Sequence, residues 1–65
     1  MIKYEKTIDF ITKSISEKYS LGYEEAIKIV YDSFLIDLLK ENFDYVTHYD
    51  ADYWAEEIMN DTVMV

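Results

Sequence analysis

The residues that could carry out chemistry gather in one segment, residues 43–58, which holds the only histidine and five carboxylates but no lysine or arginine. Imidazole and carboxylate groups together can bind zinc, iron or manganese. The combination that resembles such a site is His48, Asp50, Asp52 and Glu56. One histidine without thiolates is a small ligand set, and Asp50 is better explained as the N-cap of a helix. The sequence therefore predicts neither a bound metal nor a cofactor.

General-base catalysis is the other chemical role open to His48. It would require a nucleophile, and the four serines fall in helical or turn contexts. Gly22 is the only glycine, so the chain has no glycine-rich phosphate loop and no nucleophile elbow. A helical chain of 65 residues also has little room for a closed pocket. We therefore predict that the protein is not an enzyme.

Five aromatic residues share this segment, and so short a stretch cannot easily bury all of their rings. Exposed tyrosine and tryptophan side chains are enriched at protein interfaces. The acids either keep a solvated face soluble or steer a basic partner toward it. The candidate protein-binding residues are Tyr45, His48, Asp52, Tyr53, Glu56 and Glu57.

The charge of the chain is unevenly distributed. Residues 1–28 contain five lysines and five acids, whereas residues 29–65 contain one lysine and nine acids and so carry the whole net charge of −8. The chain has no arginine, and nucleic-acid binding requires basic groups that neutralise phosphates. We expect a protein partner of basic character and no nucleic acid.

Helices must position this segment, because the chain has no proline and one glycine. Apolar residues recur every three or four positions over residues 4–19, which predicts a first helix. Gly22 is an acceptable N-cap for a second helix, whose predicted apolar face is Ala26, Ile27, Val30, Tyr31 and Phe34. The apolar run that follows either continues this helix or begins a third, and we favour a break at Asp32-Ser33.

The last predicted helix covers residues 51–60, with Asp50 as its N-cap. Tyr49 and Trp54 then fit a hydrophobic staple, which fixes the angle at which the chain enters the helix. Asn60-Asp61 would end the helix. The fold prediction is all-α, a small bundle of three to four helices that starts with an αα-hairpin. Residues 1–61 would form one domain, and residues 62–65 a frayed tail.

Neither a signal peptide nor a stretch of roughly 20 apolar residues is present, so we expect no membrane association and a cytoplasmic location. A domain of this size has marginal stability, and cysteine is absent, so a disulfide cannot add to it. Association of two copies, which would bury the tyrosines in a structural homodimer, is therefore an alternative to binding a different protein.

The chain also resembles a family of small bacterial helical proteins that are often encoded beside an ADP-ribosyltransferase-like toxin. The shared features are the step Phe43-Asp44-Tyr45-Val46, a later tyrosine at Tyr53, and the acidic pair before isoleucine in Glu56-Glu57-Ile58. The start of the second helix, Tyr23-Glu24-Glu25, fits the pattern loosely. The resemblance implies an antitoxin-like binding role without catalytic residues.

This chain departs from the family pattern at two positions. The family places a histidine where this chain has Thr47, and a glycine where it has Asp50. The resemblance therefore assigns no role to His48. Composition and resemblance together predict a non-enzymatic interaction module that binds a protein through an acidic, aromatic C-terminal surface.

Overall fold

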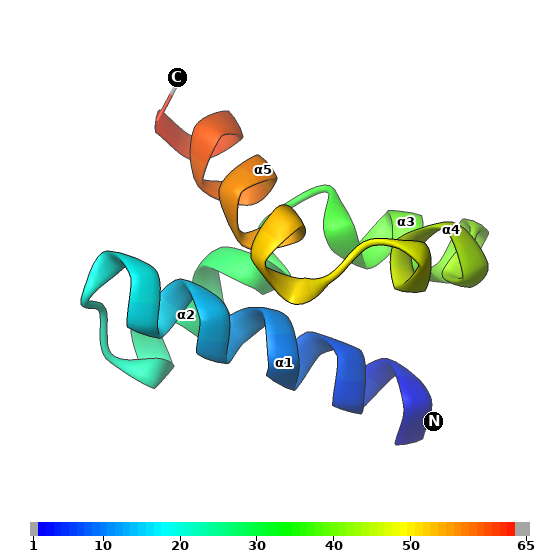
Figure 1. The fold of residues 1–65 in the computed structure, drawn as a ribbon, viewed down its shortest axis with the longest axis horizontal. Helices are drawn as coiled ribbons and strands as arrows, with labels where there is room; N and C mark the ends of the chain where they lie inside the picture. The colour runs from blue at the N-terminus through cyan, green and yellow to red at the C-terminus, as the bar shows by residue number, and fades with distance from the viewer. Residues whose placement is uncertain (1, 64–65) are drawn as a thin grey trace.

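The computed structural model describes residues 2–63, with side chains described for residues 4–61, and over this part of the chain helices joined by short connections form the fold without a strand. The helices are α1 (Ile2–Tyr19), α2 (Tyr23–Tyr31), α3 (Leu35–Glu41), α4 (Phe43–His48) and α5 (Ala51–Val63) (Figure 1). The all-α prediction is confirmed. These residues form five helices rather than three or four, because α4 was not predicted as a helix.

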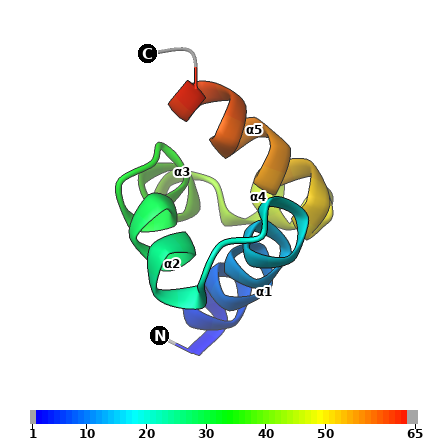
Figure 2. The same ribbon diagram turned by 90° about the vertical axis from the view of Figure 1, so that its left-hand side faces the viewer.

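Helix α1 links the early and late parts of the chain, because it contacts both α2 and α5. It packs against α2 on one side and against α5 on the other, and α3 packs against α4 (Figures 1 and 2). The short turn after α1 returns the chain along it as α2, and the chain then passes through α3 and α4 before α5 crosses back over α1. Residues 43–58 are thereby placed over the first half of the chain.

The end of α1 depends on a residue with left-handed backbone geometry. Ser20 has φ of 56°, and the Leu21 N–H donates to the Ser16 carbonyl at 3.1 Å. This six-to-one bond across a left-handed residue is a Schellman motif at the end of the helix. Glycine usually occupies the left-handed position that Ser20 holds here. Gly22 follows with φ of −66° and is the N-cap of α2, as predicted, although it has no side chain to bond the helix.

The predicted break between the second and third helices is confirmed. Helix α2 ends at Tyr31, and the Ser33 hydroxyl donates to the Val30 carbonyl at 2.6 Å. The same oxygen accepts the Leu35 N–H at 3.2 Å, so Ser33 satisfies backbone groups of both helices.

Side-chain caps also begin α4 and α5. Asn42 accepts the Tyr45 N–H at 3.3 Å, and Asp50 accepts the Tyr53 N–H at 2.9 Å. The N-cap predicted at Asp50 is confirmed. The predicted end at residue 60 is wrong, because the helical backbone continues to Val63. Of the tail predicted at 62–65, residues 62 and 63 are therefore helical, and residues 64 and 65 lie outside the described part.

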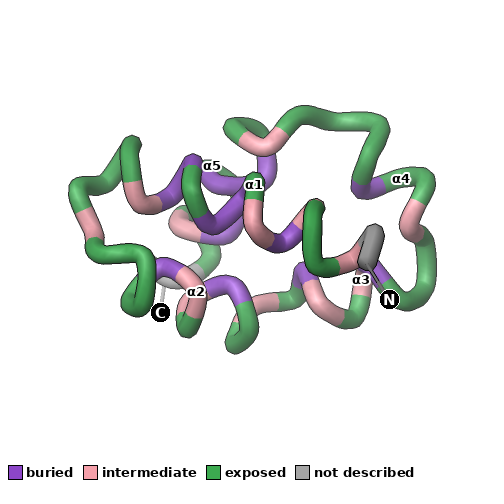
Figure 3. The backbone as a smooth tube through the Cα atoms, turned by 90° about the horizontal axis from the view of Figure 1, so that it is seen from below, coloured by how far each residue is buried: buried purple, intermediate pink, exposed green. Residues whose placement is uncertain are grey.

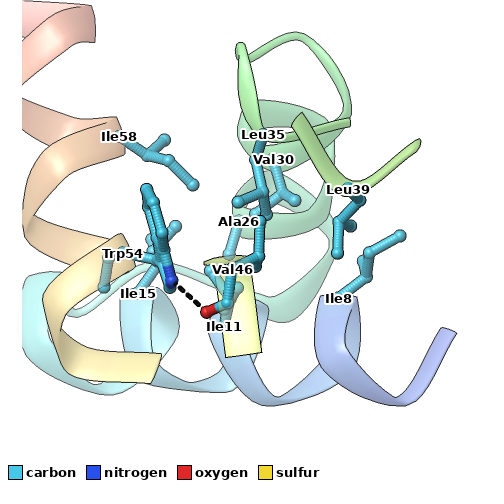
Figure 4. Close-up of a cluster of buried hydrophobic side chains, with 11 residues drawn as sticks. Ile8, Ile11, Ile15, Ala26, Val30, Leu35, Leu39, Val46, Trp54 and Ile58 are labelled. Carbon is cyan, nitrogen blue, oxygen red and sulfur yellow. Dashed lines mark hydrogen bonds between the residues drawn. The ribbon is translucent and has the colours of Figure 1, made fainter. Parts of the chain in front are cut away.

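Among the residues whose side chains are described, eleven buried apolar residues form the core, and all five helices contribute to it (Figures 3 and 4). Each fully buried aliphatic side chain contributes about 1.5–3 kcal/mol relative to an exposed one. Tyr31 was expected to join this core but is 55% exposed. Ala26 and Val30 define the buried side of α2, and Tyr31 lies about 100° around the helix axis from Val30.

Candidate functional site

Four rings from the predicted interaction segment form one cluster, which we call the aromatic cluster: Tyr45, Tyr49, Tyr53 and Trp54. Tyr49 and Tyr53 are stacked, with ring centroids 4.4 Å apart. The Trp54 ring meets the other three edge-on, at 5.9 Å from Tyr45, 5.9 Å from Tyr49 and 4.9 Å from Tyr53. Edge-to-face and offset-stacked pairs at these separations are favourable beyond the area that they bury.

Trp54 fixes the position of this cluster. Its side chain is 3% exposed, and its indole Nε1–H donates to the Val46 carbonyl at 2.7 Å (Figure 4). Val46 lies in the last turn of α4, where carbonyls have no donor within their own helix. The contact predicted between Tyr49 and Trp54 is present, and it sets the angle between the α4–α5 connection and α5.

The three tyrosines of the cluster are all partly exposed. Tyr45 is 42% exposed, Tyr49 38% and Tyr53 37%. Partial desolvation of the Tyr53 hydroxyl and the nearby Glu57 carboxylate raise the pKa of Tyr53 above its ordinary value. Each ring is therefore packed against a fixed neighbour while one side remains open to a partner.

The other candidate residues occupy different positions. His48 is exposed at the end of α4, and its ring meets Tyr49 edge-on at 5.1 Å. Asp52 accepts a hydrogen bond from the buried Ser14 hydroxyl, and Glu56 pairs with Lys18 at 2.9 Å. That carboxylate raises the pKa of Lys18.

Asp52 and Glu56 thus connect α5 to α1, in addition to any role at the surface. Glu57 is exposed and makes no hydrogen bond or ion pair with the described residues. Asp44, on α4, is exposed in the same way. These two acids are consequently freer to meet a partner than two of the acids that the sequence singled out.

The four residues considered as a metal site do not converge. Asp50 caps α5, while Asp52 and Glu56 bond to side chains of α1. Among the residues that the structure describes, no three His, Cys, Asp or Glu side chains lie close enough together to hold a metal ion.

A groove lies beside the aromatic cluster, between α1 and the connection from α4 to α5, and has a volume of about 290 Å³. Its apolar lining is formed by Phe10, Ile11, Val46, Tyr49, Ala51 and Trp54. Phe10 is 56% exposed and was missed by the sequence analysis. The sequence contains a signal for this residue, because Phe10 is a large apolar residue that lies outside the predicted apolar stripe of α1.

No family model matches the chain, and no curated protein or solved structure matches it significantly. None of the helices formed by residues 2–63 combines the length and the apolar character needed to cross a membrane. Function is therefore inferred from the positions and chemistry of the side chains.

Proposed function

We propose that this protein is a non-enzymatic interaction module that binds another protein through the surface formed by α4 and α5. The observation that carries the proposal is the aromatic cluster, in which three partly exposed tyrosines pack around the buried Trp54. Rings that are already held in place lose little conformational freedom on binding, so their contact area contributes efficiently to affinity. Tyrosine and tryptophan are also the residues most often found at the energetic centres of interfaces.

The proposed partner is basic, and the proposed location is the cytoplasm. From Phe43 to Val65 the chain has no lysine or arginine, and Asp44 and Glu57 are exposed on this surface. Such a surface attracts a cationic protein and raises its rate of association. The same charge repels nucleic acid.

The resemblance to antitoxin-like proteins supports a more specific form of the proposal, in which the basic partner is a toxin. The residues that carry the resemblance, Phe43–Val46, Tyr53 and Glu56–Ile58, belong to α4 and α5 and include two rings of the aromatic cluster. A toxin-like product of a neighbouring gene that co-purifies with this protein would support this form. A neighbouring product that does not bind would contradict it.

The aromatic contribution can be tested by affinity capture from the native host. The tagged wild type is compared with a Tyr45→Ser/Tyr53→Ser variant and with a Tyr19→Ser/Tyr31→Ser control, whose tyrosines are similarly exposed on α1 and α2. We expect one protein to be retained by the wild type and the control and lost by the cluster variant. Equal recovery by all three would refute the proposal.

The contribution of charge requires substitutions that do not disturb the fold. Asp44→Lys/Glu57→Lys changes acids that make no ion pair with the described residues, whereas changing Asp52 or Glu56 would also break contacts with α1. Glu17→Lys/Glu25→Lys alters the net charge equally, but on α1 and α2. We expect only the first pair to weaken capture, and equal weakening by both would show that charge acts without a specific surface.

The alternative is a structural homo-oligomer in which the exposed tyrosines bury against a second copy. The exposed rings of the aromatic cluster favour it, whereas the net charge of −8 on each copy opposes it near neutral pH. Sedimentation at micromolar concentration distinguishes the two. A monomer would exclude the homo-oligomer.

A further inference from the structure

We infer that the groove beside the aromatic cluster binds an apolar side chain from a cationic, amphipathic helix of the partner protein. This inference rests on the proposed function and adds to it a specific site and the chemistry of the segment that is recognised. It also includes Phe10 of α1, which lies outside the segment that the sequence indicated.

The size and lining of the groove favour a side chain as its occupant. Its volume of about 290 Å³ lies at the lower limit of small-molecule pockets, which span about 300–1,000 Å³. Ile11, Val46 and Ala51 contribute apolar surface, and Phe10 forms an edge with more than half of its area exposed. A protruding aliphatic side chain would cover the Phe10 ring and remove apolar surface from water on both partners.

The charge around the groove selects a cationic segment over a second copy of this chain. Asp50 lines the groove, and α4 and α5 carry the exposed Asp44 and Glu57. Two copies, each of net charge −8, repel each other, whereas a lysine-rich helix would be attracted. An amphipathic helix supplies both properties, because its apolar residues occupy one face and its lysines flank that face.

The difference in charge between the two sides of the groove also fixes the orientation of the partner's helix. On α1, Lys6 lies four residues before Phe10 and Lys13 lies three residues after it. This helical spacing places both lysines on the same side of α1 as Phe10. Lys13 is paired with Asp9 at 3.1 Å, so the α1 side is close to neutral or positive. The cationic groups of the partner must therefore face α4 and α5.

Trp54 is the only tryptophan of the chain and lines the groove, so its fluorescence reports occupation directly. The probe is a synthetic amphipathic helix of leucine and lysine, titrated into the full chain at low salt. One control peptide keeps the lysines and replaces the leucines by serine, and the other keeps the leucines and replaces the lysines by glutamate. We expect saturable binding of the first peptide only, weakened by added salt.

Protein variants place this binding in the groove. Phe10→Ala should weaken it roughly tenfold, as expected for loss of a central aromatic contact, whereas Tyr31→Ala, an equally exposed ring on α2, should not change it. Asp44→Lys/Glu57→Lys should weaken binding, and Lys6→Glu should leave it unchanged or strengthen it. Circular dichroism of each variant verifies that the helices are retained.

Several results would overturn the inference. These are equal binding of the serine-containing peptide, no binding of the leucine–lysine peptide, or no effect of Phe10→Ala. Capture of the native partner separates this failure from failure of the proposed function. If Phe10→Ala retains the partner while Tyr45→Ser/Tyr53→Ser loses it, the interaction module stands and the groove is not its anchor. If neither variant loses it, both proposals fail.

Discussion

Replacement of Trp54 by phenylalanine tests how far the interaction surface depends on one buried side chain. The substitution keeps an aromatic ring in the core but removes the indole N–H that donates to the Val46 carbonyl at 2.7 Å. It also removes part of a side chain that is 3% exposed and contacts the three tyrosines of the aromatic cluster.

Two effects set the expected loss of stability. A buried carbonyl left without its donor costs about 1–3 kcal/mol. The space left by the smaller ring adds roughly 1 kcal/mol, because neighbouring side chains collapse only partly into it. The sum is about 2–4 kcal/mol, against a total stability of about 3–10 kcal/mol for a domain of this length. The Trp54→Phe variant should therefore lose a large part of its free energy of unfolding. It should be partly unfolded if the stability of the wild type lies at the low end of this range.

The measurement is urea unfolding followed by far-ultraviolet circular dichroism, which does not depend on the tryptophan that has been replaced. Tyr31→Phe is the matched control, since it removes a polar atom from an exposed ring and should change stability by less than about 0.5 kcal/mol. A Trp54→Phe variant that unfolds within about 0.5 kcal/mol of the wild type would refute the role assigned to this hydrogen bond.

Three further predictions concern turns, caps and titration. Ser20→Gly should stabilise the protein by about 0.5–1 kcal/mol, measured by urea unfolding, because glycine adopts a φ of 56° without the steric cost that serine incurs. Asn42→Ala should destabilise it by about 1 kcal/mol in the same assay, since the Tyr45 N–H loses its cap, and an unchanged midpoint would contradict this. The Tyr23 hydroxyl donates a hydrogen bond to Asp9 and, with Lys13, lowers the pKa of this carboxyl below its ordinary value. The stabilisation that Asp9 contributes is therefore present above the ordinary pKa and is lost as the pH falls through the lower pKa of the folded state. Tyr23→Phe should raise the pKa of Asp9 in an NMR titration, and an unshifted value would show that the hydrogen bond is not the main cause.

The fold class and most helix boundaries could be predicted from the sequence because local signals agree with the structure. The apolar spacing of α1, the break at Asp32-Ser33 and the cap at Asp50 each act within a few residues. Helix α4 was missed because it has only six residues, too few for a periodic pattern. Asn42 followed by Asp44 was the available signal, since this pair provides an N-cap and an acid in the first turn.

The candidate site was predicted less completely because it depends on contacts between distant residues. Tyr45 and Tyr53 were selected for their type, and the structure packs both partly exposed rings against the buried Trp54. No local pattern indicates that Asp52 and Glu56 bond to α1, because their partners lie 38 residues earlier in the chain. Pairings at such separations follow from the way that the helices pack.

The packing of α1 against α5 has a consequence for synthesis of the chain. Its buried residues pack against α5, and the contacts from Ser14 and Lys18 reach Asp52 and Glu56. At the usual rate of translation, about 5–20 residues per second, the ribosome takes roughly 2–7 s to proceed from the end of α1 to Glu56. During that interval one apolar side of α1 has no partner within its own chain, so the nascent protein can complete its core only after α5 has emerged.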